Sequence, residues 1–462
     1  MNISKLIYSN LNMYASAICL TVLYSNATAQ QSLSDSTVAQ LELAVAGFQE
    51  RYHSPSIAVA IVHEDRIIFS DARGYTDIEK KTPATIDSRY QIQSVTKAFT
   101  ATMFMQLTER GIINFMDPVS KEIPEFVGNA TYFELATHNS GLPRNSPADI
   151  QFAKQVDRWL MQKKDEGPLR SADKADFIKS LAFVTGQYPS YDFLRQDTRH
   201  YSNLGYGLLG LALERAAGKD YEAYILSNIC QPLGLNNTGF GTVGDSIARG
   251  YYYQGDSTGF IRSPDFYPES MVPAGGMYST ARDMTRFISA QFDENNQVIS
   301  AKGRQMMQQL GIGWLRNHPY IQQEGSMLGA RAEIVFHPAL KIGWVILANT
   351  TDFPFQRINQ YIADLIVPLY QQKPIYNLQK YVGTYKLDGG YGMLQIYLSD
   401  GKLYSTYLQE LLPNVPLQFS GDYSLTAKGK DGHDIRYEFI PGTENNIKAL
   451  SLNQLLWKKQ EN

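Results

Sequence analysis

Cysteine is almost absent from this chain, since only Cys19 and Cys230 occur among its 462 residues. Once residues 1–29 are removed as argued below, Cys230 alone is left, which excludes an intrachain disulfide and a cysteine metal cluster. Cys230 lies in the apolar run ILSNICQPLGL, and we interpret it as a small core residue. The seven histidines show no paired metal-ligand spacing on a helix, so the sequence predicts neither a metal nor another cofactor.

A strong charge of one sign is also absent. The formal net charge is -3, and no run rich in lysine and arginine occurs. The chain therefore has no basic field that would favour nucleic acid or anionic lipid.

Long apolar segments are missing as well, and the N-terminus has the features of a secretory signal peptide over residues 1–29. Lys5 gives a positive start, Met13–Leu23 is a short apolar stretch, and residues 27–29 (ATA) offer a cleavage site. The apolar stretch is too short to span a bilayer. An uncleaved anchor or a buried helix is the alternative. We expect a periplasmic or secreted protein with no stable membrane span after cleavage.

Residues 33–370 mix strand and helix patterns, which favours an α/β domain of the α+β type with an antiparallel sheet. Strands are expected at both ends of this region, with helices between them. The expected strands are Ser56–Val62, Arg66–Phe69, Ile334–Phe336 and Ile342–Leu347, and the expected helices are Val95–Arg110 and Gly205–Ala217.

The pattern changes after a predicted linker at residues 371–376. Residues 377–462 contain short apolar runs separated by turn pairs such as Gly389-Gly390 and Asp400-Gly401. Ala449–Trp457 is one of the expected strands. Short strands with frequent turns indicate a small all-β barrel or sandwich.

Ser94-Val95-Thr96-Lys97 is the leading candidate for chemistry. Positions i and i+3 of a helix share a face, so the hydroxyl and the amine can meet. A neutral lysine activates a serine by taking its proton, and a helix start offers N–H groups to an oxyanion. The spacing alone is weak evidence, because Ser171 and Lys174 repeat it in a polar stretch that we interpret as solvated surface.

Tyr201-Ser202-Asn203 is the second candidate. A tyrosine beside a lysine is suited to relaying protons, and an asparagine amide to orienting the lysine and the substrate. The alternative for Tyr201 is a core tyrosine with a satisfied hydroxyl.

A series of segments in the same order resembles the serine β-lactamase-like family, which includes class C β-lactamases, D-alanyl-D-alanine carboxypeptidases and related esterases. The resemblance covers roughly Leu41 to Thr351. The segment starting at Tyr381 (YVGTY) is similar to the lipocalin-like β-barrel appended to some members. The matching segments are GYTDIEKKTPATIDSRYQIQSVTKAFTATMFMQL, LTERGIINFMDPVSKEIPEF, ELATHNSGLP, YSNLGYGLLG, ICQPLGLNNTGF and PAGGMYSTARDMTRF.

This resemblance implies a transpeptidase-like fold with an all-helical lobe beside the sheet, and it implies roles for individual residues. Ser94 would be acylated, with Lys97 as the base for that step. Tyr201 would relay protons or act as base in deacylation, and Asn203 would position the substrate. His138 matches a position that we interpret as structural.

The family's third element, Lys-Thr-Gly or His-x-Gly on an edge strand, is altered in this chain. The best register is Gln323-Glu324-Gly325-Ser326, in which Gln323 replaces the cation. A neutral amide offers no full charge to a substrate carboxylate. The change argues against the prediction of β-lactamase or carboxypeptidase activity. It argues less against the prediction that the protein forms a serine acyl-enzyme. The backbone N–H groups of Ser94 and Ser326 would still form the oxyanion hole.

Arg331 lies where the family has small or aromatic residues. We hypothesise that it restores a cation to the substrate site. The alternative is a surface or structural arginine.

Three functions are compatible with these residues. The first is an exported serine hydrolase that acts on an ester or amide, such as a D-amino-acid peptide. The second is an acyltransferase or transpeptidase with the same acyl-enzyme. The third is a non-catalytic envelope protein that binds ligands with a retained fold. For the two enzymes the expected partner is a small-molecule or peptide acyl substrate.

Overall fold

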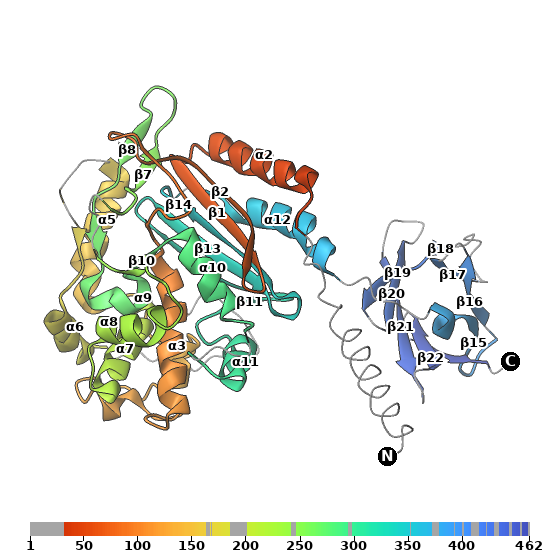
Figure 1. The fold of residues 1–462 in the computed structure, drawn as a ribbon. Coiled ribbons are helices and arrows are strands. Elements are labelled where there is room, and N and C mark those ends of the chain that lie inside the picture. The colour runs from red at the N-terminus through yellow and green to blue at the C-terminus, as the bar shows by residue number, and fades with distance from the viewer. Residues whose placement is uncertain are drawn as a thin grey trace, which may run out of the picture. The chain divides into compact units, whose positions relative to one another are not determined.

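The computed structural model describes residues 32–460 except 163–166, 168, 185–200, 242–245, 294–297, 352, 372–377 and short segments after 391 (392, 400–401, 408–414, 422, 429–433, 443–445, 453–454). The predicted signal peptide and most of the predicted linker lie outside the described residues. The chain divides into two compact units, residues 1–370 and 371–462 (Figure 1).

Seven of the described strands form one antiparallel sheet in the first unit, in the order β11-β12-β13-β14-β1-β2-β3. Strands from both ends of the unit lie side by side, since β1 pairs with β14 from Ile57 opposite Ala348 to His63 opposite Ile342. This confirms the predicted antiparallel sheet. Its strands are β1 (Ser56–His63), β2 (Arg66–Asp77), β3 (Thr82–Pro83), β11 (Leu315–Asn317), β12 (Tyr320–Met327), β13 (Ala330–His337) and β14 (Ile342–Ala348).

Strand β1 shows why the sheet has helices on both faces. Its residues are apolar at every position from Ile57 to Val62, and successive side chains point to opposite faces. Ile57 and Val59 belong to a core with helices α2 (Asp35–Arg51) and α12 (Phe355–Tyr370). Ala58 belongs to a larger core that includes residues of most other helices, although not of α5 (Ile150–Gln162). Figure 1 shows α2 and α12 on one face of the sheet and α10 (Ala281–Ser289) on the other.

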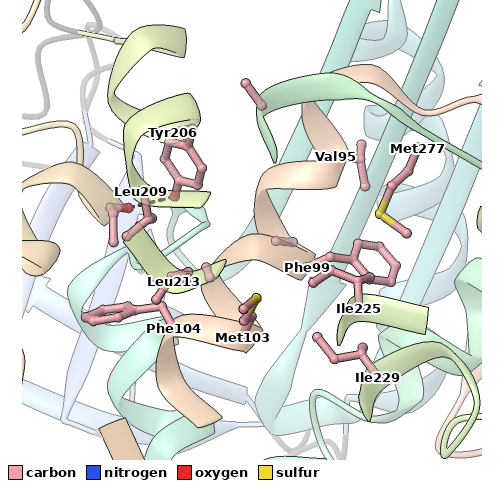
Figure 2. Close-up of a cluster of buried hydrophobic side chains, with 14 of the residues drawn as sticks. Val95, Phe99, Met103, Phe104, Tyr206, Leu209, Leu213, Ile225, Ile229 and Met277 are labelled. Atoms are coloured by element: carbon pink, nitrogen blue, oxygen red, sulfur yellow. Dashed lines mark hydrogen bonds between the residues drawn. The ribbon is translucent and has the colours of Figure 1, made fainter. Parts of the chain in front are cut away.

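Helix α3 (Thr96–Glu109) lies at the centre of the larger core. Every residue from Thr96 to Leu107 is buried, so this part of the helix is enclosed on all its faces. Figure 2 shows Phe99 and Met103 of this helix among side chains from α7 and α8. The remaining helices of the unit are α4 (Tyr132–Ala136), α5 (Ile150–Gln162), α6 (Lys174–Leu181), α7 (Asn203–Ala217), α8 (Tyr221–Ile225), α9 (Val272–Gly275) and α11 (Ala301–Leu310), with single turns η1 (Gln93–Val95), η2 (Val119–Lys121), η3 (Pro147–Asp149), η5 (Leu226–Cys230), η6 (Glu269–Met271) and η7 (Pro338–Leu340).

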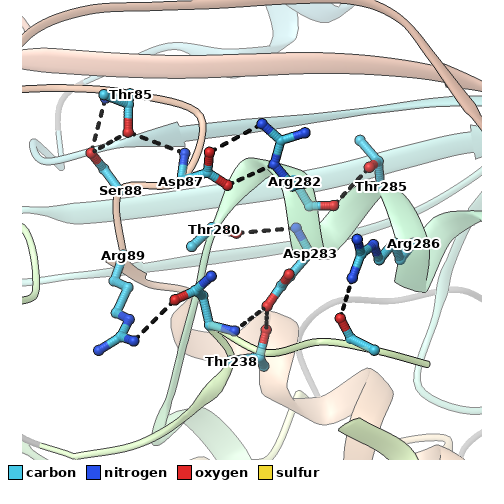
Figure 3. A network of polar contacts seen from close by, with 12 residues as sticks. Thr85, Asp87, Ser88, Arg89, Thr238, Thr280, Arg282, Asp283, Thr285 and Arg286 are labelled. Carbon is cyan, nitrogen blue, oxygen red and sulfur yellow. Dashed lines mark hydrogen bonds and ion pairs between the residues drawn. The ribbon is translucent and has the colours of Figure 1, made fainter. Parts of the chain in front are cut away.

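A polar network holds the segment that leads into η1 (Figure 3). Arg282 of α10 makes two contacts with Asp87, at 2.7 and 3.0 Å, and this guanidinium lowers the pKa of the Asp87 carboxyl. Asp283 is buried and accepts hydrogen bonds from the N–H of Asn237 and the hydroxyl of Thr238. The network thus fixes the chain shortly before the turn that carries Ser94.

Short strands complete the first unit. β10 (Met277–Ser279) lies between β4 (Tyr90–Gln91) and β6 (Gly239–Phe240). The other two pairs are β5 (Leu169–Arg170) with β9 (Phe266–Tyr267), and β7 (Tyr251–Tyr253) with β8 (Phe260–Arg262).

The second unit is a curled antiparallel sheet of nine described strands with its own apolar core. The predicted strand Ala449–Trp457 is wrong as a single element, because Leu452 pairs with Leu455 and the segment forms a hairpin. Among the described residues, edge strands β18 and β19 are not paired with each other, so the structure is an open half-barrel. Its elements are η8 (Leu378–Tyr381), β15 (Gly383–Leu387), β16 (Met393–Ser399), β17 (Lys402–Tyr407), β18 (Val415–Pro416), β19 (Gln418–Gly421), β20 (Ser424–Lys428), β21 (Asp434–Pro441), β22 (Ile447–Leu452) and β23 (Leu455–Lys459).

Membrane-spanning helices and metal-ligand clusters are both absent from the described residues. None of the described helices has both the length and the hydropathy of a membrane span. The described part of the chain contains no group of three or more His, Cys, Asp or Glu side chains arranged to hold a metal ion. Cys230 is a buried residue of the larger core, as its sequence context predicts.

Two helical glycines give a test of packing beside α3. A Cβ on Gly210 of α7 would lie 2.2 Å from Cγ of Pro273, whereas a Cβ on Gly47 of α2 would meet no atom within 4 Å. We expect Gly210→Ala to lower the free energy of unfolding by about 1–3 kcal/mol through overpacking. Gly47→Ala is expected to raise it by about 0.5–1 kcal/mol, because alanine is the better helix former. Denaturant unfolding measures both, and equal changes would contradict the close α7–α9 contact.

Candidate active site

Ser94 lies in the turn η1, directly before helix α3. Gln93 immediately before it has a φ of 49°, in the left-handed region that a residue with a side chain rarely adopts. Such a conformation costs on the order of 1 kcal/mol and is kept where the surroundings hold it. Here the Ile92 N–H donates to the Met277 carbonyl at 3.0 Å, which fixes the entry to the turn. Ser94 is thereby presented at the helix start, as its sequence context predicts.

Lys97 is completely buried, and its Nζ has three polar neighbours. It lies 3.0 Å from Ser94 Oγ, 2.9 Å from Asn203 Oδ1 and 2.7 Å from the carbonyl oxygen of Ala274. Asn203 is the first residue of α7, and Ala274 belongs to α9. The structure therefore brings together three of the predicted site residues and adds a main-chain carbonyl.

These neighbours are compatible with both forms of the amine. The oxygens of Asn203 and Ala274 can only accept hydrogen bonds, whereas the Ser94 hydroxyl can donate or accept. An ammonium would donate to all three oxygens, and a neutral amine can donate to two of them while its lone pair accepts from the Ser94 hydroxyl, so burial decides between the two forms. Burial, together with the Arg144 guanidinium, lowers the pKa of Lys97 well below the usual value for a lysine. The arrangement therefore suits Lys97 to take the proton of Ser94.

Tyr201 completes the group around the nucleophile. Its hydroxyl is hydrogen-bonded to the Ser94 side chain, and Lys97 Nζ lies 4.8 Å from the centre of its ring. Burial raises the pKa of Tyr201 to about 12, although Ser94 and Arg144 act in the opposite direction. The phenol is therefore protonated at neutral pH. This state suits a proton relay between Ser94 and a leaving group better than a resting base.

His138 packs against the ring of Tyr201. The two ring centres are 4.3 Å apart, and His138 Nδ1 accepts a hydrogen bond from the Ser202 N–H at 3.2 Å. Burial, with contributions from Lys97 and Arg144, lowers the pKa of His138 to about 3, so the imidazole is neutral. The structural role expected for this histidine agrees with these contacts.

Ser202 explains how Tyr201 and Asn203 are placed. It is the N-cap of α7, and its Oγ accepts a hydrogen bond from the Gly205 N–H at 2.8 Å. The same hydroxyl donates to the Pro143 carbonyl at 2.7 Å. The tyrosine before the cap and the asparagine after it are consequently fixed against the loop that follows His138.

Gly325 brings strand β12 against the nucleophile. A Cβ at this position would lie 2.6 Å from Ser94 N and 2.4 Å from the Ile92 carbonyl oxygen, so no larger residue fits without a shift. N–H groups in a first helical turn lack intrahelical partners, and the Ser94 N–H belongs to this class. The close approach of the two backbones is what an oxyanion hole of the Ser94 and Ser326 amides requires. The role of Ser326 stays a prediction.

Gln323 does not extend freely toward the substrate. Its side chain is buried, and its Nε2 donates to the Gly313 carbonyl at 3.3 Å. The residue lines the cavity described below, yet its amide is already engaged. Direct substrate binding by Gln323 stays a prediction that this hydrogen bond makes less favourable.

Arg331 and Glu324 face each other on neighbouring strands. Arg331 Nη2 lies 3.6 Å from Glu324 Oε2, its Nη1 donates to the Thr351 carbonyl at 3.4 Å, and its guanidinium lies 4.9 Å from the Phe355 ring centre. The charge of Arg331 is thus shared with a carboxylate. Glu324 also acts on Tyr201, whose pKa it raises. The hypothesis that Arg331 restores the missing cation is not tested by these contacts.

A cavity of about 660 Å³ opens in front of Ser94. Its wall includes all the predicted site residues except Lys97, which lies behind Ser94. Phe152 and Phe266 stack with ring centres 4.8 Å apart and form an apolar part of the wall. Pockets of this size and mixed lining are typical of small-molecule sites.

The competing pair Ser171 and Lys174 is not assembled as a catalytic pair. Lys174 is exposed and forms an ion pair with Glu214, and Ser171 donates to the Ala172 carbonyl. Ser171 itself is buried and lines the cavity, so the prediction of a solvated surface is wrong for the serine. The same spacing therefore has different outcomes at the two places.

Sequence reasoning missed three participants. The Ala274 carbonyl binds Lys97 through the main chain, so the identity of the side chain gave no signal. Glu324 was named only as a member of the segment Gln323–Ser326, with no role of its own. Arg144 follows ELATHNSGLP directly and lies 5.3 Å from the Tyr201 ring centre. The one signal for Arg144 was that a catalytic lysine needs a lowered pKa, which a nearby positive charge provides.

Comparison with known proteins agrees with this geometry. The sequence model of the Beta-lactamase family matches residues 41–367. The chain belongs to the Beta-lactamase family. This family lies in the superfamily of serine β-lactamases and penicillin-binding proteins, whose members generally act as serine hydrolases or transpeptidases through an acyl-enzyme.

Two curated relatives illustrate the range of the family. Beta-lactamase-like protein 2 of Dictyostelium discoideum is 29% identical over 355 residues, which are 69% of this chain and 60% of that protein. Protein flp of Staphylococcus aureus (strain N315) is 24% identical over 372 residues, 76% of this chain and 68% of that protein. The match thus spans about 60% of the length of the Dictyostelium relative.

Solved structures share the fold at low identity. The octameric penicillin-binding protein homologue from Pyrococcus abyssi has a TM-score of 0.62 and 22% identity, covering 91% of this chain and all of that one. SurE has a TM-score of 0.58 and 18% identity, covering 92% of this chain and 99% of that one. These likenesses confirm the mixed α/β fold with its helical lobe.

The two lysines of the repeated spacing allow a matched test of the base. We expect Lys97→Ala to lower the rate of Ser94 acylation by about 10²–10⁴-fold, the usual contribution of a general base. Lys174→Ala removes the same type of side chain from an exposed ion pair and should leave that rate within about threefold, because surface pairs contribute little. Stopped-flow acylation by an activated ester measures both. An equal loss of the acylation rate in both variants would show that Lys97 is not the base.

The pH dependence of acylation gives a second test of the base. Lys97 reacts in its neutral form, so the rate rises with pH as the amine loses its proton. Since burial lowers the pKa of Lys97, we expect the rate to level off well below about 10.4, the ordinary lysine value. Lys97→Arg should abolish the plateau, because a guanidinium keeps its protons. A wild-type rate still rising at pH 10 would contradict a neutral resting lysine.

Proposed function

We propose that this chain is an exported serine hydrolase that forms an acyl-enzyme on Ser94 and hydrolyses an ester or amide. Lys97 takes the proton of Ser94 as the hydroxyl attacks the acyl carbon. Tyr201 passes a proton to the leaving group, and water then releases the acyl group. The N-terminal signal-like segment at residues 1–29 supports export.

The single observation that carries the proposal is the set of contacts around Lys97 Nζ. Two of its neighbours, Asn203 Oδ1 and the Ala274 carbonyl, only accept hydrogen bonds, and the third is the Ser94 hydroxyl at 3.0 Å. A protein that only binds ligands has no need to bury an amine in this way, since desolvating it costs free energy. The arrangement favours an enzyme over the non-catalytic envelope protein.

The substrate class is narrower than the family as a whole. Gln323, at the position of the family's lysine or histidine, is neutral, and its amide already donates to the Gly313 carbonyl. This argues against β-lactams and D-alanyl-D-alanine peptides as the best substrates. One structural neighbour, SurE, has been solved with D-Leu, which supports the inclusion of D-amino-acid esters among the compounds tested.

Intact-mass spectrometry tests the proposal. The mature protein is exposed to a fluorophosphonate, an activated ester of a D-amino acid and a penicillin. We expect a covalent adduct with the first two on the wild type and none on Ser94→Ala. The Ser171→Ala variant is the matched control and should be labelled like the wild type.

The outcomes separate the candidate functions. An adduct that survives in Ser94→Ala, or no adduct with any probe, would overturn the acyl-enzyme and favour the binding protein. If acyl transfer to an added amine or alcohol exceeds hydrolysis in product analysis, the enzyme is an acyltransferase with the same intermediate.

A further inference from the structure

The loop after His138 places a cation at the wall of the cavity. The Arg144 carbonyl accepts hydrogen bonds from the N–H groups of Asn203 and Leu204, at 2.8 and 3.2 Å. The preceding Pro143 carbonyl accepts the Ser202 hydroxyl. The backbone of Arg144 is thus fixed to the first turn of α7, the same turn that positions the groups around Ser94.

The side chain of Arg144 is exposed to the cavity rather than used by the fold. It lines the cavity beside Ser94, and its guanidinium lies over the Tyr201 ring at 5.3 Å from the centre. Within the described residues, no carboxylate forms an ion pair with it. A fixed, solvent-facing guanidinium without a carboxylate partner is suited to bind an anionic group of a ligand bidentately.

The other charges of the cavity wall are largely engaged. Arg331 is paired with Glu324. Asp149 is buried and accepts the Ala172 N–H at 3.0 Å. Asp157 is exposed on α5. Arg144 is therefore the lining cation whose charge the described residues leave available, and it lies on the Tyr201 side of the nucleophile.

We propose that Arg144 is a specificity-determining residue that binds a carboxylate of the acyl substrate beside Ser94. It supplies, from the loop after His138, the positive charge that Gln323 cannot supply from strand β12. This inference rests on the proposed function, and it narrows the substrates to esters or amides that carry a carboxylate. By its position over Tyr201 it is also a positioning residue for the proton transfers.

Matched esters test the preference. One pair carries the charge on the acyl side (the 4-nitrophenyl monoester of adipic acid against 4-nitrophenyl hexanoate). The other carries it on the leaving group (3-carboxyphenyl hexanoate against phenyl hexanoate). We expect the wild type to prefer the charged ester of at least one pair about tenfold in kcat/KM. Arg144→Gln should lower kcat/KM for that ester about 10²-fold, mainly through KM, and its neutral partner less than tenfold.

Variants of other arginines make the test specific. Arg144→Lys should retain part of the preference, because it keeps the charge but loses the bidentate geometry. Arg66→Gln removes an exposed charge that does not line the cavity, and it should keep both rates. Loss of the preference in Arg331→Gln with retention in Arg144→Gln would assign the carboxylate to Arg331 and overturn the proposal. A wild-type preference for the neutral ester in both pairs would overturn it as well.

The pH profile gives a readout that a merely structural role would not move. Arg144 lowers the pKa of Lys97, so its removal raises that pKa. We expect the rising limb of acylation in Arg144→Gln to shift to higher pH, even for the neutral ester. Fluorophosphonate labelling of Ser94 separates a failure of the proposed function from a failure of the inference about Arg144. A wild type that is not labelled fails the proposed function, whereas a labelled wild type without the carboxylate preference fails this inference alone.

Discussion

Lys97 is fully buried, and its three polar neighbours carry no charge. A buried ammonium without a counter-ion is costly, so the fold favours the neutral amine. Several local features follow from this constraint. The turn at Ser94 presents the hydroxyl, and the cap at Ser202 positions the Asn203 side chain. The Ala274 carbonyl is the third partner of the amine. Helix α3, which carries this amine, is buried from Thr96 to Leu107.

Charges that act at longer range complete the arrangement. Arg144 lowers the pKa values of Lys97, His138 and Tyr201 together, since all three lie near its guanidinium. Glu324 opposes this effect at Tyr201. Burial and Glu324 together outweigh the effect of Arg144, so the tyrosine remains protonated at neutral pH. The site thus holds a neutral base and a proton donor on the two sides of one hydroxyl, which is the division of work that acyl transfer needs.

Much of this arrangement could be predicted from the sequence. The apolar run of β1, the helix that begins near Ser94 and the capping serine at position 202 follow local rules, and family segments linked them into one site. What could not be predicted depends on contacts across the chain. The Ala274 carbonyl has no side-chain signature, and the exposure of Arg144 to the cavity depends on how its loop docks on α7. The split of Ala449–Trp457 into two strands was missed because neither glycine nor proline marks the reversal between Leu452 and Leu455.

The partners of Lys97 come from distant parts of the chain, since Asn203 and Ala274 lie 106 and 177 positions away from it in sequence. Closing such long loops is among the later events in folding, because non-local contacts must first overcome the entropy of the connecting chain. A nascent or partly folded chain therefore lacks the two distant acceptors that surround the Lys97 amine. The full set of contacts around this amine exists only when residues 203 and 274 have reached it. Under the proposed function, labelling of Ser94 would in this sense report completed folding of the first unit.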